Sequence, residues 1–440
     1  MNPERIRTVI ADQRDELHRV LSEPTIIERE GLAHWGAWGR ENIIKVITGP
    51  RRAGKSVFSM QLVQTADEGY AYAYVNFDDE RLVGIGTSDL DRVVEALLQV
   101  YGDAKQIILD EVQNLEGWEL FASRLQRQGF NLTITGSNAR LLSSELATHL
   151  TGRHVAIEIL PFSFREFLIF TGTRPEGGEV FSTVEEAKLK GKLLEYLEVG
   201  GFPEAAKMAL KDRQMAKTYL RTLYSTVVGR DIVGRHRIKY LKTVREAADL
   251  LISSYSSMVS LRNIAKAFGM RSIHTAKNYA SYIEESYLVF FLEKYSRGLK
   301  ERSNAPKKAY CIDTGILNSV AFRAGENLGK LMENLVAVEL MRRRATDSSL
   351  ELYYWRDYRQ REVDFVLKRG AGVDELIQVT YADSRDDVAD RELKALLAAS
   401  DELGCRELLV ITWDYEGEEL VDGKRVRFVP LWRWLLEDRQ

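Results

Sequence analysis

The stretch Lys45 to Met60, KVITGPRRAGKSVFSM, decides the fold of this chain. Its first residues continue the β-branched run NIIKVIT, which predicts a buried strand, and its last residues open VFSMQLVQTADEG, whose apolar residues have helical spacing. Between them GPRRAGKS matches the pattern G-x-x-x-x-G-K-[ST]. Strand, glycine-rich loop and helix in this order predict a phosphate-binding loop, because the backbone N–H groups of such a loop surround phosphate oxygens.

The residue types in the loop suit a nucleoside triphosphate bound with magnesium. Two glycines allow the backbone to curl around phosphate, the lysine can reach the terminal phosphates, and the final serine hydroxyl can bind the metal. The expected nucleotide contacts are Gly49, Pro50, Arg51, Arg52, Ala53, Gly54, Lys55, Ser56 and Val57. ATP and Mg²⁺ are therefore the expected cofactors, and an ordinary basic turn is the alternative.

A second motif, AKQIILDEVQNLEGW, carries two adjacent acids directly after a strand-like run. In this arrangement Asp110 holds magnesium through water, together with Ser56, and Glu111 orients or deprotonates the attacking water. The adjacent pair indicates ATP hydrolysis rather than nucleotide storage. The alternative is an acidic helix N-terminus, placed there to suit the helix dipole.

Further polar residues lie after or before later strands. NLTITG predicts a buried strand, and Ser137 and Asn138 beyond it either sense the γ-phosphate or cap the next helix. Arg153, in LTGRHVAIEI, either projects into the nucleotide of a neighbouring subunit or forms a surface ion pair. We assign catalysis to Lys55, Glu111, Asn138 and Arg153. The acidic turn in YAYVNFDDERL is interpreted as the start of a helix, without chemistry.

Length and composition limit what else the chain does. Its 440 residues suggest two to four domains, and a net charge of −3 gives no global positive field for nucleic acid or membranes. Its two cysteines form no disulfide framework, which favours a reducing cytoplasm. The N-terminus lacks the apolar block of a signal peptide, and we expect no membrane association.

The order of these motifs resembles the AAA+ ATPases, in particular an archaeal and bacterial family related to the origin-recognition and STAND-type groups. LPFSFREFL, YLEVGGFPEA and VVGRDIVGRHRIK extend the resemblance down the chain. It implies an α/β fold: an N-terminal helix and P-loop AAA+ core over 1–165, a helical lid over 166–245, a winged helix-turn-helix over 246–305 and a restriction-endonuclease-like domain over 306–440. A homo-oligomer is also expected.

The segment VSLRNIAKAFGMRSIHTAKNYASYIEESYLVFFLEKYS follows the plan of a winged helix, with two helices that meet near Gly269 and a strand after them. From Leu261 to Tyr310 there are ten Lys or Arg residues and four Glu residues, a surplus of six cations. This surplus predicts DNA as a partner, and a protein-interaction module is the alternative. The residues expected to contact DNA are Arg271, His274, Lys277 and Asn278.

The C-terminal segments LMENLVAVELMRRR, LYYWRDYRQREVDFVL and DELIQVTYA look like the nuclease-like domain of the same family. In active nucleases of that class a helix glutamate, a strand aspartate and an acid-x-lysine element surround the metal. Here Gln378 and Thr380 replace the acid and the lysine, beside Glu333 and Asp364. We expect a degenerate, non-cleaving site that still binds DNA or a partner. Glu362 and Glu375 are possible substitutes, and ion pairs of Glu333 and Asp364 with nearby arginines are the alternative.

The function expected from these observations is a Mg²⁺-dependent ATPase that couples ATP binding and hydrolysis to the binding or remodelling of duplex or branched DNA. One alternative is a STAND-like switch in which ATP binding recruits a protein. The other, an ATP-regulated nuclease, requires a substitute metal site.

Mixing two inactive variants tests the role of Arg153. If this arginine acts across a subunit interface, Arg153→Ala mixed with Lys55→Ala regains part of the ATP hydrolysis, because one subunit supplies the intact loop and its neighbour the arginine. Hydrolysis is measured as phosphate release. Mixed assemblies that stay inactive would contradict a role across subunits.

Overall fold

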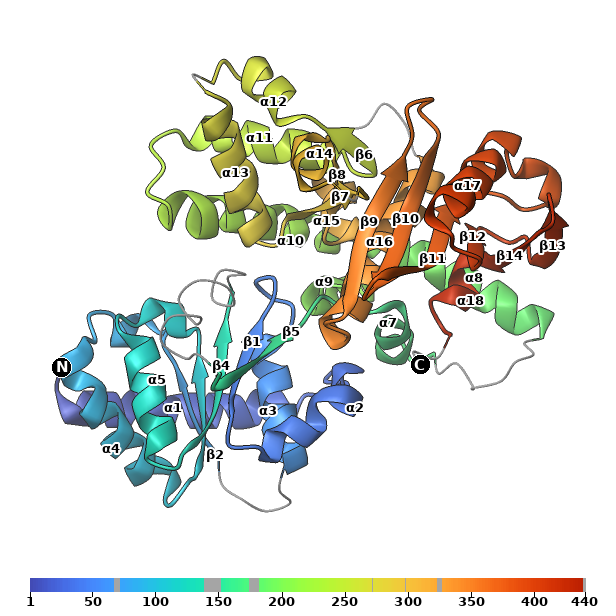
Figure 1. Ribbon diagram of the computed structural model, residues 1–440. Helices are drawn as coiled ribbons and strands as arrows, with labels where there is room; N and C mark the ends of the chain where they lie inside the picture. Colours follow the sequence, from blue (N-terminus) through green and yellow to red (C-terminus); the bar gives the residue numbers. More distant parts are fainter. Residues whose placement is uncertain are drawn as a thin grey trace. The chain divides into compact units, whose positions relative to one another are not determined.

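The computed structural model describes residues 1–66, 72–137, 152–173, 182–270, 272–296, 298–322 and 327–437. They form two compact units, Met1–Pro161 and Phe162–Gln440, each with helices and strands (Figure 1). The division lies close to the expected end of the ATPase core at residue 165. The three segments expected to follow that core all lie in the second unit. Within the described ranges, no helix is long and apolar enough to cross a membrane.

The first unit is built on a parallel sheet in the order β2-β3-β4-β1-β5. Its strands are β1 Ile44–Thr48, β2 Tyr72–Asn76, β3 Gln106–Asp110, β4 Asn131–Gly136 and β5 His154–Glu158. Its helices are α1 Pro3–Leu21, α2 Gly31–Trp35, α3 Lys55–Ala66, α4 Leu90–Tyr101 and α5 Trp118–Arg127, with short 3₁₀ turns η1 Gly36–Arg40, η2 Glu80–Leu82, η3 Thr87–Asp89 and η4 Val112–Asn114. Helices cover both faces of the sheet, as a parallel sheet requires.

Alternation along β1 shows why this strand is buried on both faces of the sheet. Val46 faces the core that α1, α4 and α5 cover, and Ile47 faces the core of α2 and α3. Figure 1 shows α4 and α5 on one side of the sheet and α2 and α3 on the other. All five residues of β1 are buried, so most of them are apolar and β-branched, and the buried Lys45 donates to the carbonyl oxygen of Glu41 at 3.0 Å.

The second unit begins with a helical section: α7 Phe164–Phe170, α8 Thr183–Val199, α9 Pro203–Ala209, α10 Arg213–Thr226, the π-helix η6 Val227–Gly234 and α11 Leu241–Ser253. The expected interruption at GGFPE separates α8 from α9. Gly201 is required there because an added Cβ would lie 2.3 Å from the Phe162 carbonyl oxygen. Its N–H donates to the Asp313 carboxylate at 2.7 Å, and Asp313 also caps the helix α15 Thr314–Val320.

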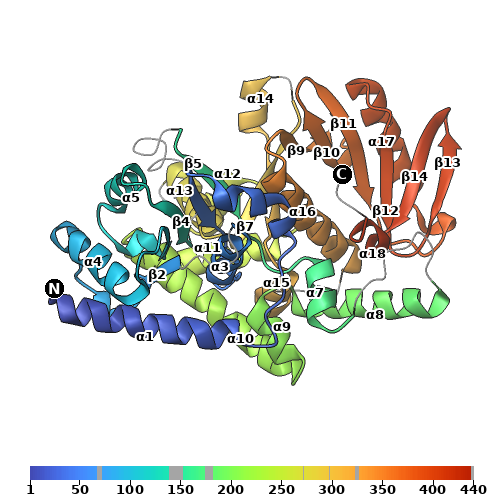
Figure 2. The same ribbon diagram turned by 90° about the horizontal axis from the view of Figure 1, so that it is seen from below.

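The remainder of the second unit forms one nine-stranded sheet in the order β13-β14-β12-β11-β10-β9-β7-β8-β6 (Figures 1 and 2). Its strands are β6 Ser257–Val259, β7 Val289–Lys294, β8 Lys307–Cys311, β9 Leu350–Arg356, β10 Glu362–Arg369, β11 Gly372–Val379, β12 Leu408–Thr412, β13 Gly417–Val421 and β14 Lys424–Pro430. The helices around it are α12 Leu261–Ala267, α13 Ile273–Glu285, α14 Leu299–Asn304, α16 Leu328–Thr346, α17 Asp390–Leu403 and α18 Leu431–Trp434, with the turn η7 Arg385–Asp387.

Three strand pairings in this sheet cross the domain boundary expected at residues 305 and 306. Strand β8, which follows that boundary, pairs antiparallel with β6 and β7, which precede it. Strand β7 in turn pairs parallel with β9. The segments expected as two separate domains are therefore joined by backbone hydrogen bonds.

Candidate functional site

The phosphate-binding loop runs from the end of β1 into α3 with the backbone that its glycines predict. Gly49 has φ +145° and Gly54 has φ +93°, both in the region that favours glycine. A Cβ at Gly49 would lie 2.0 Å from the carbonyl oxygen of Ile159. Helix α3 begins at Lys55, so the loop ends at a helix N-terminus, where N–H groups and the helix dipole favour phosphate.

A buried arginine fixes the loop in place. The Arg29 guanidinium donates to the carbonyl oxygen of Ala53 at 2.9 Å and to that of Leu160 at 2.7 Å. Arg29 is buried, so these two bonds tie the loop to the segment after β5. Arg29 has no recognisable sequence signal, because its partners are backbone carbonyl groups, which every residue has.

Two predicted magnesium ligands meet at the carboxyl edge of the sheet. The Ser56 hydroxyl donates to Asp110 Oδ2 at 2.8 Å, and the Tyr74 hydroxyl donates to the same oxygen at 2.7 Å. The Thr135 hydroxyl donates to the other carboxylate oxygen. Burial, followed by the charge of Glu111, raises the pKa of Asp110. A hydroxyl and a carboxylate suit magnesium, which keeps several waters and uses few protein ligands.

Glu111 is held beside this corner in an uncommon backbone conformation. Its φ is +52°, which is infrequent for a residue other than glycine and occurs often at functional sites. Its N–H donates to the Thr135 hydroxyl at 3.1 Å, and its carboxylate accepts a hydrogen bond from the Gln113 amide. The same amide lies 3.4 Å from the Ser137 hydroxyl. Gln113, which the sequence analysis missed, therefore connects the acid to the end of β4.

Two basic residues of the loop have defined contacts. Lys55 Nζ lies 2.9 Å from the carbonyl oxygen of Pro50 and is buried. Arg51 lies 3.8 Å from the carboxylate of Asp78, which also accepts a hydrogen bond from Asn114. Asp78 was assigned no chemistry from the sequence, and here it positions a loop arginine. Asp79 caps η2, as the interpretation of a helix start requires.

Of the two other residues assigned to catalysis, Asn138 falls outside the described ranges. Arg153 precedes β5, and its carbonyl oxygen accepts the N–H of Ile44 at 3.0 Å, at the amino edge of the sheet. The phosphate loop follows the opposite end of β1. The two ends of this strand are about 13 Å apart, because four steps of roughly 3.3 Å separate its first residue from its last. Arg153 is thus remote from the phosphate loop of its own chain, and its role across subunits stays a prediction.

Three of the four residues expected to contact DNA lie on one helix. His274, Lys277 and Asn278 are exposed on one face of α13, and Ala276, Ala280 and Ile283 on its other face are buried. Arg271 lies outside the described ranges. The surplus of cations in this segment is smaller at the surface than the sequence implies, because Lys308 is 2% exposed and paired.

Lys308 is the centre of the nuclease-like site. Its Nζ lies 2.7 Å from Asp364 Oδ1, 2.8 Å from Glu333 Oε1 and 2.8 Å from Glu362 Oε1. The Gln378 amide donates to the other Asp364 oxygen at 2.8 Å. The expectation of ion pairs with nearby arginines is wrong for Glu333 and Asp364, since each is paired with this lysine. Glu362 joins them, as strand alternation allows.

The electrostatics of this centre favour a charged lysine. Burial alone would lower the pKa of Lys308, but the carboxylates of Asp364 and Glu333 raise it well above its ordinary value. Burial and the charge of Asp364 raise the pKa of Glu333. Glu375 lies elsewhere, 3.5 Å from Arg427. Across the described ranges, no group of three or more His, Cys, Asp or Glu residues is arranged to hold a metal.

Thr380 belongs to the edge of the same centre. It is buried, and its side chain hydrogen-bonds the carboxylate of Glu392 on α17. The structure therefore brings Glu333, Asp364 and Gln378 together and places Thr380 beside them. The role of Lys308 in this site was not predicted from the sequence PKKAY, because a lysine in a basic segment is ordinarily a surface residue.

Comparisons with known proteins divide the chain into three matched segments. A model described as an AAA domain matches residues 41–168. Two domains of unknown function, DUF8612 and DUF4143, match residues 190–327 and 328–434. The AAA segment contains the loop, the acidic strand β3 and the polar end of β4.

Among solved structures, the Walker-type ATPase PABY2304 of Pyrococcus abyssi is 15% identical, with 67% of this chain and 96% of that chain covered and a TM-score of 0.42. An uncharacterized protein of Haemophilus influenzae is 28% identical over 403 residues, which cover 89% of this chain and 94% of the relative. The uncharacterized protein MJ1544 of Methanocaldococcus jannaschii is 36% identical over 406 residues, which cover 90% of this chain and 88% of MJ1544. The chain therefore belongs to the family of MJ1544, and its residues 41–168 match an AAA domain.

Proposed function

We propose that this protein is a Mg²⁺-dependent ATPase that couples ATP binding and hydrolysis to DNA binding or remodelling. The observation that carries the ATPase half is the contact between Ser56 and Asp110, 2.8 Å, with Glu111 next to it. A hydroxyl at the start of α3 and a carboxylate at the end of β3 converge at one point beside a phosphate-binding loop. A binding site for phosphate alone would not require this acidic corner.

Each group has a role that its position supports. The loop N–H groups and Lys55 bind the phosphates, and Ser56 and Asp110 would hold Mg²⁺, which neutralises phosphate charge when it is bound. Glu111 accepts the proton of the attacking water or orients that water. Gln113 and Ser137 hold the Glu111 carboxylate at the end of β4, where the γ-phosphate would lie. Arg29 keeps the Ala53 carbonyl of the loop away from the anion because its guanidinium binds that oxygen.

The DNA half is supported by the arrangement around α13. The order α11, β6, α12, α13, β7, α14, β8, with the strands arranged β6-β8-β7, supports the proposed winged helix. The exposed face of α13 carries His274, Lys277 and Asn278, which can reach phosphates or bases. The alternative of a switch that recruits a protein predicts ATP binding without stimulation of hydrolysis by DNA.

The C-terminal half is proposed to be nuclease-like and non-cleaving. The succession α16, β9, β10, β11, α17, β12 brings a helix glutamate and a strand aspartate together, as the resemblance implies. The Lys308 ammonium occupies the point where their carboxylates converge. A divalent cation placed there would face a fixed positive charge, so the ATP-regulated nuclease is the least supported alternative.

Replacing Glu111 by Gln should stop turnover and leave ATP binding intact. The amide keeps the size of the side chain and removes the base, which costs on the order of a hundredfold or more in hydrolysis rate. Phosphate release and equilibrium binding of a labelled nucleotide measure the two properties. Glu116→Gln, an exposed acid five residues further on, is the matched control and should behave as the wild type. Hydrolysis at the wild-type rate in Glu111→Gln would remove Glu111 from the catalytic role.

Replacing Lys277 and Arg271 by Ala should weaken duplex DNA binding and flatten its dependence on salt. Each lost phosphate contact lowers the slope of log affinity against log salt by about one. Binding is measured by fluorescence anisotropy over a range of salt concentrations, with stimulation of ATP hydrolysis as a second signal. A slope equal to that of the wild type would place the duplex surface elsewhere.

Purified protein should not cleave linear, flapped or branched DNA with magnesium or manganese. Asp364→Asn, which keeps the shape of the buried side chain, should leave ATP hydrolysis close to wild type, since Asp364 binds Lys308 and not the nucleotide. Gel analysis of labelled substrates detects products. Metal-dependent cleavage that disappears in Asp364→Asn would revive the nuclease alternative.

A further inference from the structure

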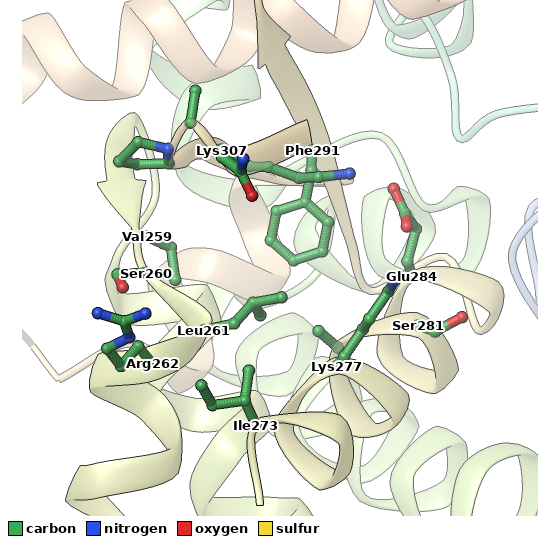
Figure 3. Close-up of a pocket in the computed structure, with 14 residues that line it drawn as sticks. Val259, Ser260, Leu261, Arg262, Ile273, Lys277, Ser281, Glu284, Phe291 and Lys307 are labelled. Atoms are coloured by element: carbon green, nitrogen blue, oxygen red, sulfur yellow. The ribbon is translucent and has the colours of Figure 1, made fainter. Parts of the chain in front are cut away.

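The second unit contains a cavity of about 580 Å³ next to α13. Helices α12 and α13, strands β7 and β8 and the end of α14 line it. Part of its lining is apolar: Figure 3 shows the aromatic ring of Phe291 and the side chains of Leu261 and Ile273 around one space. Ile273 is 46% exposed although it is a large aliphatic residue. An apolar surface of this kind, left partly open, suits a flat or aliphatic group of a ligand.

Cations surround the cavity from three elements. Arg262 comes from α12, Lys277 from α13 and Lys307 from β8, and Glu284 is the one acid among the residues that line it. Lys307 is also paired with Glu293 at 2.9 Å, so its charge is partly balanced. The matching ligand is therefore an anion that also carries an apolar, flat group. A nucleotide has both, because its base stacks on aromatic rings and its phosphate pairs with cations.

A second hollow continues the first. It has a volume of about 700 Å³ and shares Asn304, Ala305 and Pro306 with the cavity. It extends to Arg356 and Tyr358 at the turn between β9 and β10. Its lining also includes Lys294 and three acids, Glu301, Asp357 and Glu402; Glu301 is paired with Lys294 at 2.8 Å and Asp357 with Arg361 at 2.7 Å. Together the two adjoining hollows form an extended surface, with Phe291 in the first and Tyr358 and Arg356 in the second, rather than a pocket for one small molecule.

The β9–β10 turn presents its aromatic side chain rigidly. Tyr358 is 80% exposed, and the Arg359 guanidinium lies 5.3 Å from the centre of its ring. Below them the N–H of Arg361 donates to Asp357 Oδ1 at 2.8 Å, and its Nε donates to Oδ2 at 2.7 Å. An exposed aromatic ring on a turn closed by these bonds is a stacking surface that loses little entropy on binding.

We propose that a single strand of nucleic acid binds along these two hollows, from the cavity beside α13, past residues 304–306, to the β9–β10 turn. Bases stack on Phe291 and Tyr358, and phosphates lie near Lys277, Arg356 and Arg359. The inference rests on the proposed DNA function and adds the substrate class, an unpaired strand. A duplex cannot use the cavity without turning a base out of its stack, which costs a few kcal/mol. An acidic peptide would match the cations but not the two separated aromatic surfaces.

Fluorescence anisotropy with the full-length protein tests this surface. The probes are a thymidine oligonucleotide of about 15 nucleotides, a uridine oligonucleotide of equal length, which separates RNA from DNA, a duplex of equal length and a polyglutamate peptide. We expect tighter binding of the single strands than of the duplex or the peptide. Tyr358→Ala should weaken single-strand binding about fivefold or more, the lower end of roughly 1–3 kcal/mol per stacked base. Tyr381→Ala, an aromatic residue 46% exposed outside both hollows, is the control and should have no effect.

A second variant tests the cavity end. Ile273 is the first residue of α13, where an acid suits the helix dipole, so Ile273→Asp should fold and should repel the strand. The surface is wrong if duplex or peptide binds at least as tightly as single strands, or if Tyr358→Ala and Ile273→Asp bind single strands like the wild type. If the surface is wrong by either criterion but the protein still binds duplex DNA, the proposed DNA function is not contradicted. Binding to none of the nucleic acids overturns both.

Discussion

The first unit depends on one buried carboxylate. Asp110 is nearly inaccessible to solvent, and a buried carboxylate is stable only when its oxygens are hydrogen-bonded. Its hydrogen bonds come from Ser56 on α3, Tyr74 on β2 and Thr135 on β4, so one side chain ties three elements to β3. The constraint that stabilises the acid also sets the geometry of the site, because it fixes the distance between the loop serine and the acidic strand.

The order of the strands explains what else reaches that corner. Strand β4 lies between the loop strand β1 and the acidic strand β3, so its carboxyl end is placed between phosphate loop and acids. Thr135 supplies the hydroxyl that binds both Asp110 and the Glu111 backbone, and Ser137 supplies the next contact, to Gln113. A sheet with β1 beside β3 would leave no position for this row of polar side chains.

The sequence predicted those parts of the site whose functional residues are neighbours in the chain. The loop, its helix and the pair Asp110 and Glu111 each lie in a short motif, so periodicity and residue type were sufficient. Arg29 and Lys308 were not predictable in this way, since their most distant partners lie 131 and 56 residues away and the pairing exists only after folding. The continuous sheet across residues 305 and 306 was missed for the same reason: strand pairing between β7, β8 and β9 leaves no local signal.

Lys308 and the proposed strand path meet at a single carboxylate. Of the three acids around Lys308, Glu362 is the most exposed, at 30%, and its other oxygen lies 4.0 Å from Arg356 Nε at the second hollow. A phosphate beside Arg356 would compete with Glu362 for the Arg356 guanidinium and would weaken the contact between Arg356 and Glu362. Lys308 would then be the main cation paired with Glu362. The two other partners of Lys308, Glu333 and Asp364, are buried and cannot move out toward the phosphate. The internal lysine thus keeps each of the three acids in an ion pair while a polyanion lies at the entrance, as the proposed non-cleaving domain requires.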